Sequence, residues 1–397
     1  MRLNSSSIAC ALMLGACTAN VPPPLVSAQS GASSPAGPNE CHSDSVSIAF
    51  DFEGAPPTRC AVLGERKFAL LITPEHTPPI NPSPWYAFRY EAAAGGDVTV
   101  ELQYLSGWHR YAPILTQNGV SRPLAAEVSD DNETALLALP AGEGVVSAQE
   151  LIGAEHYHKA LERWAAATGT APFELGRSHD GRPIEALRFG NSASPHLVVL
   201  LGRQHPPEVT GAIAMEAFVD RIAAMVAGDP ALAGRYQFMV VPLLNPDGVA
   251  RGHWRANLGG RDLNRDWGEF SQPETQAMKR WLDALPEEVR PVLMLDFHST
   301  SSNLFYVQGD EADARGIRFR SDWLDGKEFR FPNYPFTINP SNANPGRGTT
   351  KNWFNWTYGI PAYTYEVDDD ADRAGTRAAA DALAQDLIPA LDRLVSP

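Results

Sequence analysis

The stretch of sequence that decides the fold is HLVVLLGRQHPPE, residues 196–208. It contains the uninterrupted apolar run Leu197–Leu201, which is typical of a strand that is buried on both faces. Polar residues follow at once, with His205 and Glu208 three positions apart. In open α/β sheets, functional sites lie just beyond the carboxyl ends of the strands. The stretch therefore predicts a buried strand that leads directly into a site.

Further apolar runs alternate with helical patterns along the chain. Strands are predicted at His196–Leu201, Gln237–Leu244, Val292–His298 and Ala362–Val367. Helices are predicted at Thr210–Ala227, Pro273–Leu285, Glu311–Leu324 and Arg373–Leu394. An earlier helix is predicted to begin at Ser147-Ala148-Gln149-Glu150, which fits a capping box, and to end at about Thr168. This alternation predicts an α/β domain over residues 147–397, with a mixed, mostly buried central sheet flanked by helices.

Residues 41–146 have a different pattern of polar and apolar residues. Short runs of alternating polarity, such as Ser45–Phe50 and Val98–Leu102, are separated by segments rich in Pro and Gly. Period-two runs between turn signals are typical of antiparallel sheets packed face to face. A smaller antiparallel β-sandwich domain is therefore predicted before the α/β domain.

The first 40 residues resemble an export signal followed by a tether. Arg2 precedes the short apolar stretch Ile8–Leu14, which is too short to span a bilayer. Leu14-Gly15-Ala16-Cys17 resembles a bacterial lipobox, so residues 1–16 are predicted to be a signal peptide and Cys17 to carry a lipid. An ordinary signal cut after Ala28 is the alternative. Residues 17–40, rich in Pro, Ser, Ala and Gly, are predicted to be a flexible tether.

These features predict an exported protein of the bacterial periplasm or cell envelope, whose contact with a membrane is limited to the lipid anchor. All four cysteines lie within the first 60 residues, which excludes a Cys-based site in the α/β domain. In an oxidising compartment, Cys41 and Cys60 are predicted to form a disulfide, with two free thiols as the alternative.

The balance of charged residues excludes one class of binding partner. The chain has 32 Lys and Arg against 47 Asp and Glu, a formal net charge of −15. Binding to phosphate backbones needs clustered basic residues, so a nucleic-acid partner is excluded.

Chemistry-bearing residues gather at three predicted strand ends. His205 and Glu208 follow the first strand, and His298 ends the strand Val292–His298. Two His and one Glu with an open fourth position are a typical ligand set of catalytic zinc, so we expect one zinc ion here. Asn245-Pro246-Asp247-Gly248, Arg255 and Asp262-Leu263-Asn264-Arg265 follow the strand Gln237–Leu244.

The ordered set of these motifs with a late Glu366, over about residues 165–395, resembles the zinc carboxypeptidases of the carboxypeptidase A type. The strings around residues 202–211, 240–248 and 262–267 are most similar to the cytosolic carboxypeptidase branch, which includes deglutamylases and places a β-sandwich before the catalytic domain. The resemblance implies a zinc-dependent peptide hydrolase that removes C-terminal residues from peptides or proteins.

The resemblance also implies roles for single residues. His205, Glu208 and His298 would bind zinc, and Asp262 would hydrogen-bond a zinc-binding His. Glu366 would be the general base, with Asp368–Asp370 as rivals, and Arg255 would stabilise the oxyanion, with Arg251 as the rival. Asn264 and Arg265 would hold the terminal carboxylate of the substrate. Asp296, on the same strand face as His298, is a further candidate partner of a zinc-binding His.

Lys351 is the hint to side-chain preference. It lies where the family has the residue at the floor of the pocket for the terminal side chain, and a basic residue there selects acidic side chains such as Glu. Arg347 is the rival, and a solvated loop Lys is the alternative. One departure is clear: relatives have a substrate-contacting Tyr about 22 residues before the base, and this chain has Asn344.

Three functional hypotheses follow. The first is a zinc carboxypeptidase acting on peptide C-termini with an acidic preference, or on cell-wall stem peptides. The second is an amidohydrolase of small acylated amino acids, similar to desuccinylases. The third is a peptide-binding lipoprotein that keeps the fold without turnover. The complete set of His205, Glu208, His298 and Glu366 favours an enzyme over the third hypothesis.

Overall fold

The computed structural model describes residues 40–76, 82–309, 312–342 and 348–396. The predicted signal peptide, Cys17 and almost all of the predicted tether lie outside these residues, as do Asn344 and Arg347. No helix in the described part of the chain is long and apolar enough to cross a membrane.

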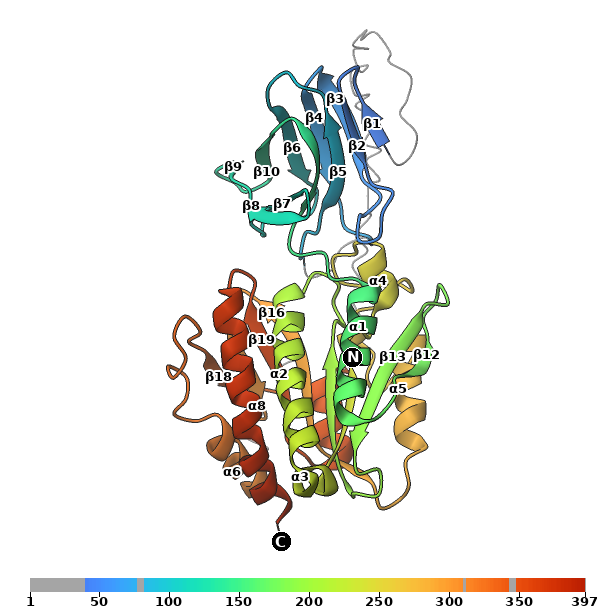
Figure 1. Ribbon diagram of the computed structural model, residues 1–397, viewed down its shortest axis with the longest axis vertical. Coiled ribbons are helices and arrows are strands. Elements are labelled where there is room, and N and C mark those ends of the chain that lie inside the picture. Colours follow the sequence, from blue (N-terminus) through green and yellow to red (C-terminus); the bar gives the residue numbers. More distant parts are fainter. Residues whose placement is uncertain (1–39, 77–81, 310–311, 343–347, 397) are drawn as a thin grey trace, which may run out of the picture. The chain divides into compact units, whose positions relative to one another are not determined.

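The N-terminal part of the described chain consists of two sheets (Figure 1). One is antiparallel throughout, in the order β1 (Glu40–His42), β2 (Val46–Ala49), β5 (Ala87–Ala92), β11 (Gly142–Ser147), β7 (Ile114–Gln117) and β8 (Val120–Pro123). The other has the order β3 (Arg59–Gly64), β4 (Lys67–Ile72), β6 (Val98–Tyr104), β10 (Thr134–Leu139) and β9 (Ala126–Val128).

Alternating side chains of the two sheets meet in one apolar core. Along β6, every second residue is buried, and Val100 and Leu102 pack in the same cluster as Ile48 and Phe88 of the other sheet. This is the packing that period-two sequence predicts for a sandwich. One pair departs from the predicted antiparallel pattern, because β4 and β6 run parallel.

The predicted disulfide is present between Cys41 of β1 and Cys60 of β3, which belong to different sheets. The two cysteines are 19 residues apart in sequence. Cross-linking a loop of this size restricts the unfolded chain and stabilises the fold by about 3 kcal/mol. We therefore expect the Cys41→Ser, Cys60→Ser double variant to lose about 2–4 kcal/mol of unfolding free energy in urea titration. Equal stability of the variant and the oxidised wild type would contradict this.

The C-terminal part contains one mixed eight-stranded sheet. Its order is β12 (Phe173–Arg177), β13 (Pro183–Gly190), β15 (Gln237–Val241), β14 (His196–Gly202), β16 (Arg290–Thr300), β19 (Ala362–Asp368), β17 (Leu304–Val307) and β18 (Thr337–Pro340). The four central strands β15, β14, β16 and β19 are parallel to one another, so their carboxyl ends meet at one edge.

Helices cover both faces of this sheet. One face packs against α1 (Ala154–Thr168), α2 (Val209–Gly228), α6 (Ala314–Trp323) and α8 (Arg373–Val395), of which α1, α2 and α8 lie side by side in Figure 1. The other packs against α5 (Pro273–Asp283) and α7 (Thr350–Tyr358). Val198 and Leu200 of β14 point to the first face, and Val199 points to the second. The predicted α/β class, with a buried mixed sheet, is therefore confirmed.

Two predicted boundaries are wrong for identifiable reasons. The strand predicted to reach Leu244 ends at Val241, because Pro242 has no N–H to continue the ladder. Ser147 does not cap a helix. It is the last residue of β11, its hydroxyl donates to the carbonyl of Gln149, and α1 begins only at Ala154 after Gly153.

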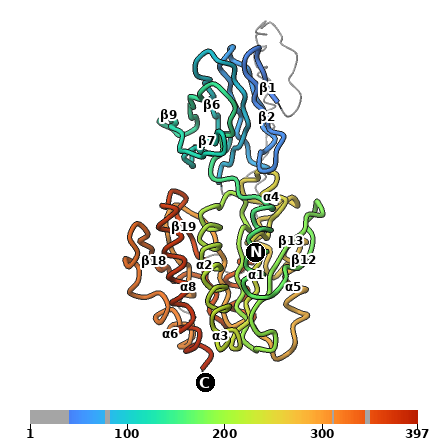
Figure 2. The backbone as a smooth tube through the Cα atoms, viewed as in Figure 1, coloured from blue at the N-terminus to red at the C-terminus, as the bar shows by residue number. Residues whose placement is uncertain are grey.

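The remaining helices are short. They are α3 (Pro230–Arg235), α4 (Pro246–Ala250) and the 3₁₀ turn η1 (Leu263–Arg265). In α4, the side chain of Asn245 caps the N-terminus by accepting from Gly248 N, and Pro246 fills the first turn. Figure 2 follows the chain from α1 through the β12–β13 hairpin into the sheet.

Candidate active site

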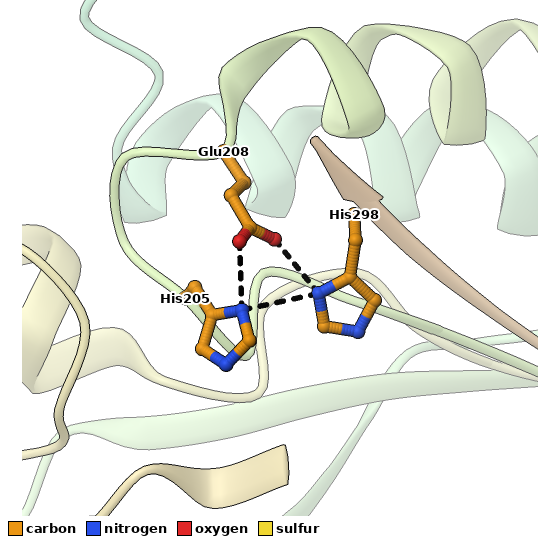
Figure 3. Close-up of side chains that lie close together, drawn as sticks. All are labelled: His205, Glu208 and His298. Carbon is orange, nitrogen blue, oxygen red and sulfur yellow. Dashed lines mark hydrogen bonds and ion pairs between the residues drawn. The ribbon is translucent and has the colours of Figure 1, made fainter. Parts of the chain in front are cut away.

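His205, Glu208 and His298 converge at the carboxyl end of the central strands (Figure 3). Nδ1 of His205 lies 2.7 Å from Glu208 Oε1, and Nδ1 of His298 lies 2.7 Å from Glu208 Oε2. The two Nδ1 atoms are 3.1 Å apart, and all three side chains are buried. The loop after β14 and the end of β16 are brought together because these strands pair in parallel up to Gly202 and Phe297.

A glycine allows α2 to approach β16 closely enough to form this cluster. A Cβ atom on Gly211, in the first turn of α2, would lie within 2.3 Å of the carbonyl oxygen of His298. Glu208 is the N-cap residue of α2, so any side chain at position 211 would push Glu208 away from His298. The glycine three positions after Glu208 is therefore part of the site.

Each imidazole ring has an aspartate beside its Nε2 atom, the outer nitrogen that faces away from Glu208. Nε2 of His205 lies 2.9 Å from Asp262 Oδ1, as predicted for Asp262, and Nε2 of His298 lies 2.8 Å from Asp296 Oδ2. A His whose outer N–H donates to a carboxylate presents its other nitrogen to a metal. Both Nδ1 atoms face Glu208, so two imidazole nitrogens and a carboxylate surround one point. This donor set fits zinc.

The charges of the cluster reinforce one another. Burial opposes ionisation of Glu208, but His205 and His298 outweigh burial and lower the pKa of Glu208. Burial also opposes a charge on His298, but Asp296 and Glu208 raise the pKa of His298 well above its usual value. The site is therefore rich in negative charge, which suits a bound cation.

We expect Asp296→Asn to weaken zinc binding about 10- to 100-fold, because the amide is a poorer partner for the outer nitrogen of His298. Competition against a chromophoric chelator measures the affinity. Asp370→Asn is the matched control, since Asp370 is an exposed carboxylate that lines the same pocket. An affinity for Asp296→Asn equal to that of the control would contradict the positioning of His298 by Asp296.

Glu366 lies on β19, directly across from His298 on β16. Its Oε2 atom is buried and has no hydrogen-bond partner among the described residues. Burial raises the pKa of Glu366 to about 7, with the repulsion of Glu208 adding to it and His298 and His205 opposing it. The structure thus places a carboxyl group that can exchange a proton near neutral pH beside the two histidines.

Arg255 lines the same pocket, together with Asn264 and Arg265 of η1. Nε of Arg255 donates to Asp262 Oδ2 at 2.7 Å, while its Nη atoms have no hydrogen-bond partner among the described residues. The rival Arg251 is instead paired with Asp180, away from the pocket. The Oδ1 atom of Asn264 accepts from Thr350 N at 2.9 Å, so Asn264 also holds the start of α7.

Lys351 lies in the first turn of α7 and also lines the pocket, with its side chain buried. Its Nζ donates to the carbonyl oxygens of Ser341 at 2.8 Å and Val307 at 3.3 Å, and to Asn342 Oδ1 at 3.2 Å. These three acceptors are uncharged. The structure therefore rules out the alternative of a solvated loop Lys.

The pocket has a volume of about 620 Å³, and its lining includes the predicted residues His205, Glu208, His298, Glu366, Arg255, Asn264, Arg265 and Lys351, but not Asp262 or Asp296. It also contains residues that the sequence did not single out for the site, among them Tyr306 of β17 and Ser83, Trp108 and Arg110 of the sandwich region. Arg110 forms an ion pair with Asp369 at 2.7 Å. Asp369 is a predicted rival for the base: its Oδ2 is held in this pair, while its Oδ1 is buried without a hydrogen-bond partner among the described residues.

Comparison with known proteins agrees with this geometry. The family model described as zinc carboxypeptidase matches residues 165–383, more than half of the chain. Cytosolic carboxypeptidase 3 of Bos taurus is 30% identical over 178 residues, covering 41% of this chain and 17% of that protein. Cytosolic carboxypeptidase 2 of Homo sapiens is 37% identical over 143 residues, covering 33% of this chain and 16% of that protein. The chain thus spans about a sixth of the length of these relatives.

Solved structures share the fold over nearly the whole chain. A metallo-carboxypeptidase from Burkholderia cenocepacia superposes with a TM-score of 0.71 at 20% identity, covering 88% of this chain and 99% of that one. A metallo-carboxypeptidase from Pseudomonas aeruginosa gives a TM-score of 0.67 at 20% identity, covering 87% and 99%. With the family match and the His–Glu–His cluster, the conclusion is plain: this chain belongs to the zinc carboxypeptidase family.

Proposed function

We propose that the protein hydrolyses the C-terminal peptide bond of peptides and prefers an acidic terminal residue. One observation carries the proposal: a single pocket holds the His–Glu–His cluster, the carboxyl of Glu366, whose Oε2 has no hydrogen-bond partner among the described residues, and four basic side chains, those of Arg110, Arg255, Arg265 and Lys351. Within this pocket, Arg255, Arg265 and Lys351 offer positive charge to the carboxylates of a substrate, whereas Arg110 is paired with Asp369.

The residues divide the chemistry between them. One zinc ion held by His205, Glu208 and His298 would lower the pKa of a water molecule and polarise the scissile carbonyl. Glu366 accepts the proton of the attacking water, a task for which a pKa of about 7 is suited. An Nη group of Arg255 donates to the carbonyl oxygen as negative charge develops on it. Glu366 then returns a proton to the leaving amine.

Binding of the substrate's terminal carboxylate is assigned to Asn264 and Arg265. Both line the pocket, and a guanidinium group matches the planar geometry of a carboxylate. We assign the acidic preference to Lys351, because its ammonium group belongs to the lining of the pocket, where it can attract the carboxylate of a terminal Glu side chain.

A peptide panel tests the activity and the preference together. Zinc-loaded protein is incubated with peptides that differ only in a C-terminal Glu, Asp, Lys, Leu or Phe, and with cell-wall stem peptides, and products are read by mass spectrometry. We expect loss of one C-terminal residue, fastest from the Glu and Asp peptides. Lys351→Met should abolish the preference and keep turnover of the Leu peptide. No turnover of any substrate would contradict the function, and an unchanged preference would contradict the role of Lys351.

We also propose export to the bacterial periplasm or cell envelope, with a lipid on Cys17 as the membrane anchor. The Cys41–Cys60 disulfide supports an oxidising compartment. In this location, stem peptides join peptide C-termini as candidate substrates. Mass spectrometry of the mature N-terminus tests the anchor, with a lipidated Cys17 as the expected first residue.

A further inference from the structure

The loop that carries Arg255 is held by a residue of the N-terminal sheets. Glu75 lies three residues beyond the end of β4, and its carboxylate accepts three successive backbone N–H groups. Oε2 accepts from Trp254 N at 2.8 Å, and Oε1 accepts from Arg255 N at 3.0 Å and from Ala256 N at 2.7 Å. Hydrogen bonds to an ionised acceptor are about twice as strong as neutral ones.

No secondary structure performs this task for the loop. Residues 254–256 lie between α4 and η1 and belong to no helix or strand, and among the described residues no acceptor other than Glu75 takes these three N–H groups. The bonds on either side are local. His253 N donates to Gly248 O, and Asn257 N donates to Arg261 O. The backbone at Arg255 is therefore fixed by one side chain from a distant part of the sequence.

The neighbouring side chains of Trp254 and Arg255 have different surroundings. Trp254 is 1% exposed and packs in the apolar core of the two N-terminal sheets, where a Cβ atom on Gly107 would lie 3.0 Å from its ring. Arg255 lines the pocket and is bound to Asp262, the partner of His205. Burial of Trp254 and the bonds to Glu75 together determine where the guanidinium group of Arg255 lies.

We propose that Glu75 is a positioning residue for the reaction: its carboxylate clamps the backbone of residues 254–256 and thereby presents Arg255 to the scissile carbonyl. This gives the N-terminal region a role in catalysis, since it supplies both the carboxylate of Glu75 and the apolar core in which Trp254 is buried. The kinetic consequence rests on the proposed role of Arg255, while the clamp itself does not.

Glu75→Gln tests the clamp with the smallest change. The amide keeps one oxygen, but its NH₂ group must face at least one backbone N–H, which then has no acceptor. Glu150→Gln is the matched control. Glu150 pairs with Arg373 at 2.9 Å, which also joins the end of the N-terminal region to the C-terminal part, and it lies outside the active-site pocket. If Glu75→Gln does not fold, Glu75→Asp replaces it. This substitution keeps the carboxylate but moves it one methylene group away from the backbone N–H groups of residues 254–256.

Hydrogen exchange of the zinc-loaded protein measures the clamp directly. We expect the amides of residues 254–256 to exchange at least about tenfold faster in Glu75→Gln than in the wild type or in Glu150→Gln, because an unbonded amide loses its protection. Unchanged protection in Glu75→Gln would overturn the proposal, whatever the enzyme does.

Kinetics on the fastest peptide of the panel measures the consequence. Misplacement of a catalytic group by about 1 Å can cost about 100-fold. We expect kcat of Glu75→Gln to fall about 10- to 100-fold with KM nearly unchanged. The same substitution should have no effect on an Arg255→Ala background. Two results would overturn the positioning role. One is a loss of kcat from Glu75→Gln that is equally large on the Arg255→Ala background. The other is an unchanged kcat of Glu75→Gln alone, while Arg255→Ala alone is slow. Full activity of Arg255→Ala would instead contradict the proposed function. Hydrogen exchange alone would then test whether Glu75 holds the backbone of residues 254–256.

Discussion

Glu366→Gln is expected to lower kcat about 10²–10⁴-fold, the usual contribution of a general base. The amide is close to the carboxylate in shape but cannot accept the proton of the attacking water. Because Oε2 of Glu366 has no hydrogen-bond partner among the described residues, the substitution breaks no bond of the fold. KM and zinc content should therefore stay close to those of the wild type. Steady-state kinetics on the panel and metal analysis measure both.

The control for this variant is Asp370→Asn, which makes the same chemical change at an exposed carboxylate of the same pocket. It should keep most of the activity. If Glu366→Gln were as active as Asp370→Asn, the base would have to be sought elsewhere in the pocket.

The pKa of Glu366 sets the acid side of the pH profile. Burial raises this pKa to about 7, and only the ionised form can accept a proton. A bound cation favours the ionised form and moves the value down. We therefore expect kcat/KM to fall about tenfold per pH unit below a midpoint at or under pH 7. Activity that rises as the pH falls through this range would contradict a carboxylate base.

His298→Ala is expected to remove both bound zinc and activity. His298 is one of the three proposed ligands, and it is the one that lies on the central sheet, where its Nε2 contacts Asp296. Two remaining ligands cannot maintain a tetrahedral site with one open position. Zinc supplies several kcal/mol of transition-state stabilisation, so turnover should fall by at least about 10³-fold.

Metal analysis after dialysis measures this loss. The wild type should hold about one zinc ion per chain and His298→Ala far less than that. His156→Ala is the control, because His156 is exposed, bonds only to Glu216 among the described residues and lies outside the pocket. A full zinc ion in His298→Ala would contradict the assigned ligand set.

The sequence predicted the elements whose signal is local. A run such as Leu197–Leu201 indicates a strand buried on both faces, and β14 is such a strand. His205, Glu208 and His298 could be placed together because parallel strands bring their carboxyl ends to one edge. Pro242 ends β15 at Val241 although the apolar run continues to Leu244, so this boundary follows from the proline and not from the hydrophobic pattern.

Contacts between distant segments could not be predicted in the same way. Nothing local marks Glu75 as the partner of residues 254–256, or Arg110 as the partner of Asp369, because each pair joins segments far apart in the sequence. The role of Gly211 was equally hidden, since it depends on how closely α2 approaches His298. Alternation along the strand placed Asp296 on the face of His298 without showing that the two side chains bond.

The proposed function requires that the pocket cuts the bond next to a free C-terminal carboxylate. It is tested most directly by incubating the zinc-loaded protein with two peptides of identical sequence ending in Glu, one with a free C-terminus and one with a C-terminal carboxamide. Mass spectrometry reads the products. The free peptide should lose its terminal Glu, and the carboxamide should be cut far more slowly, because it offers no terminal carboxylate to Arg265 and Asn264. Cleavage of both peptides at equal rates, or at an internal bond, would contradict the proposed function.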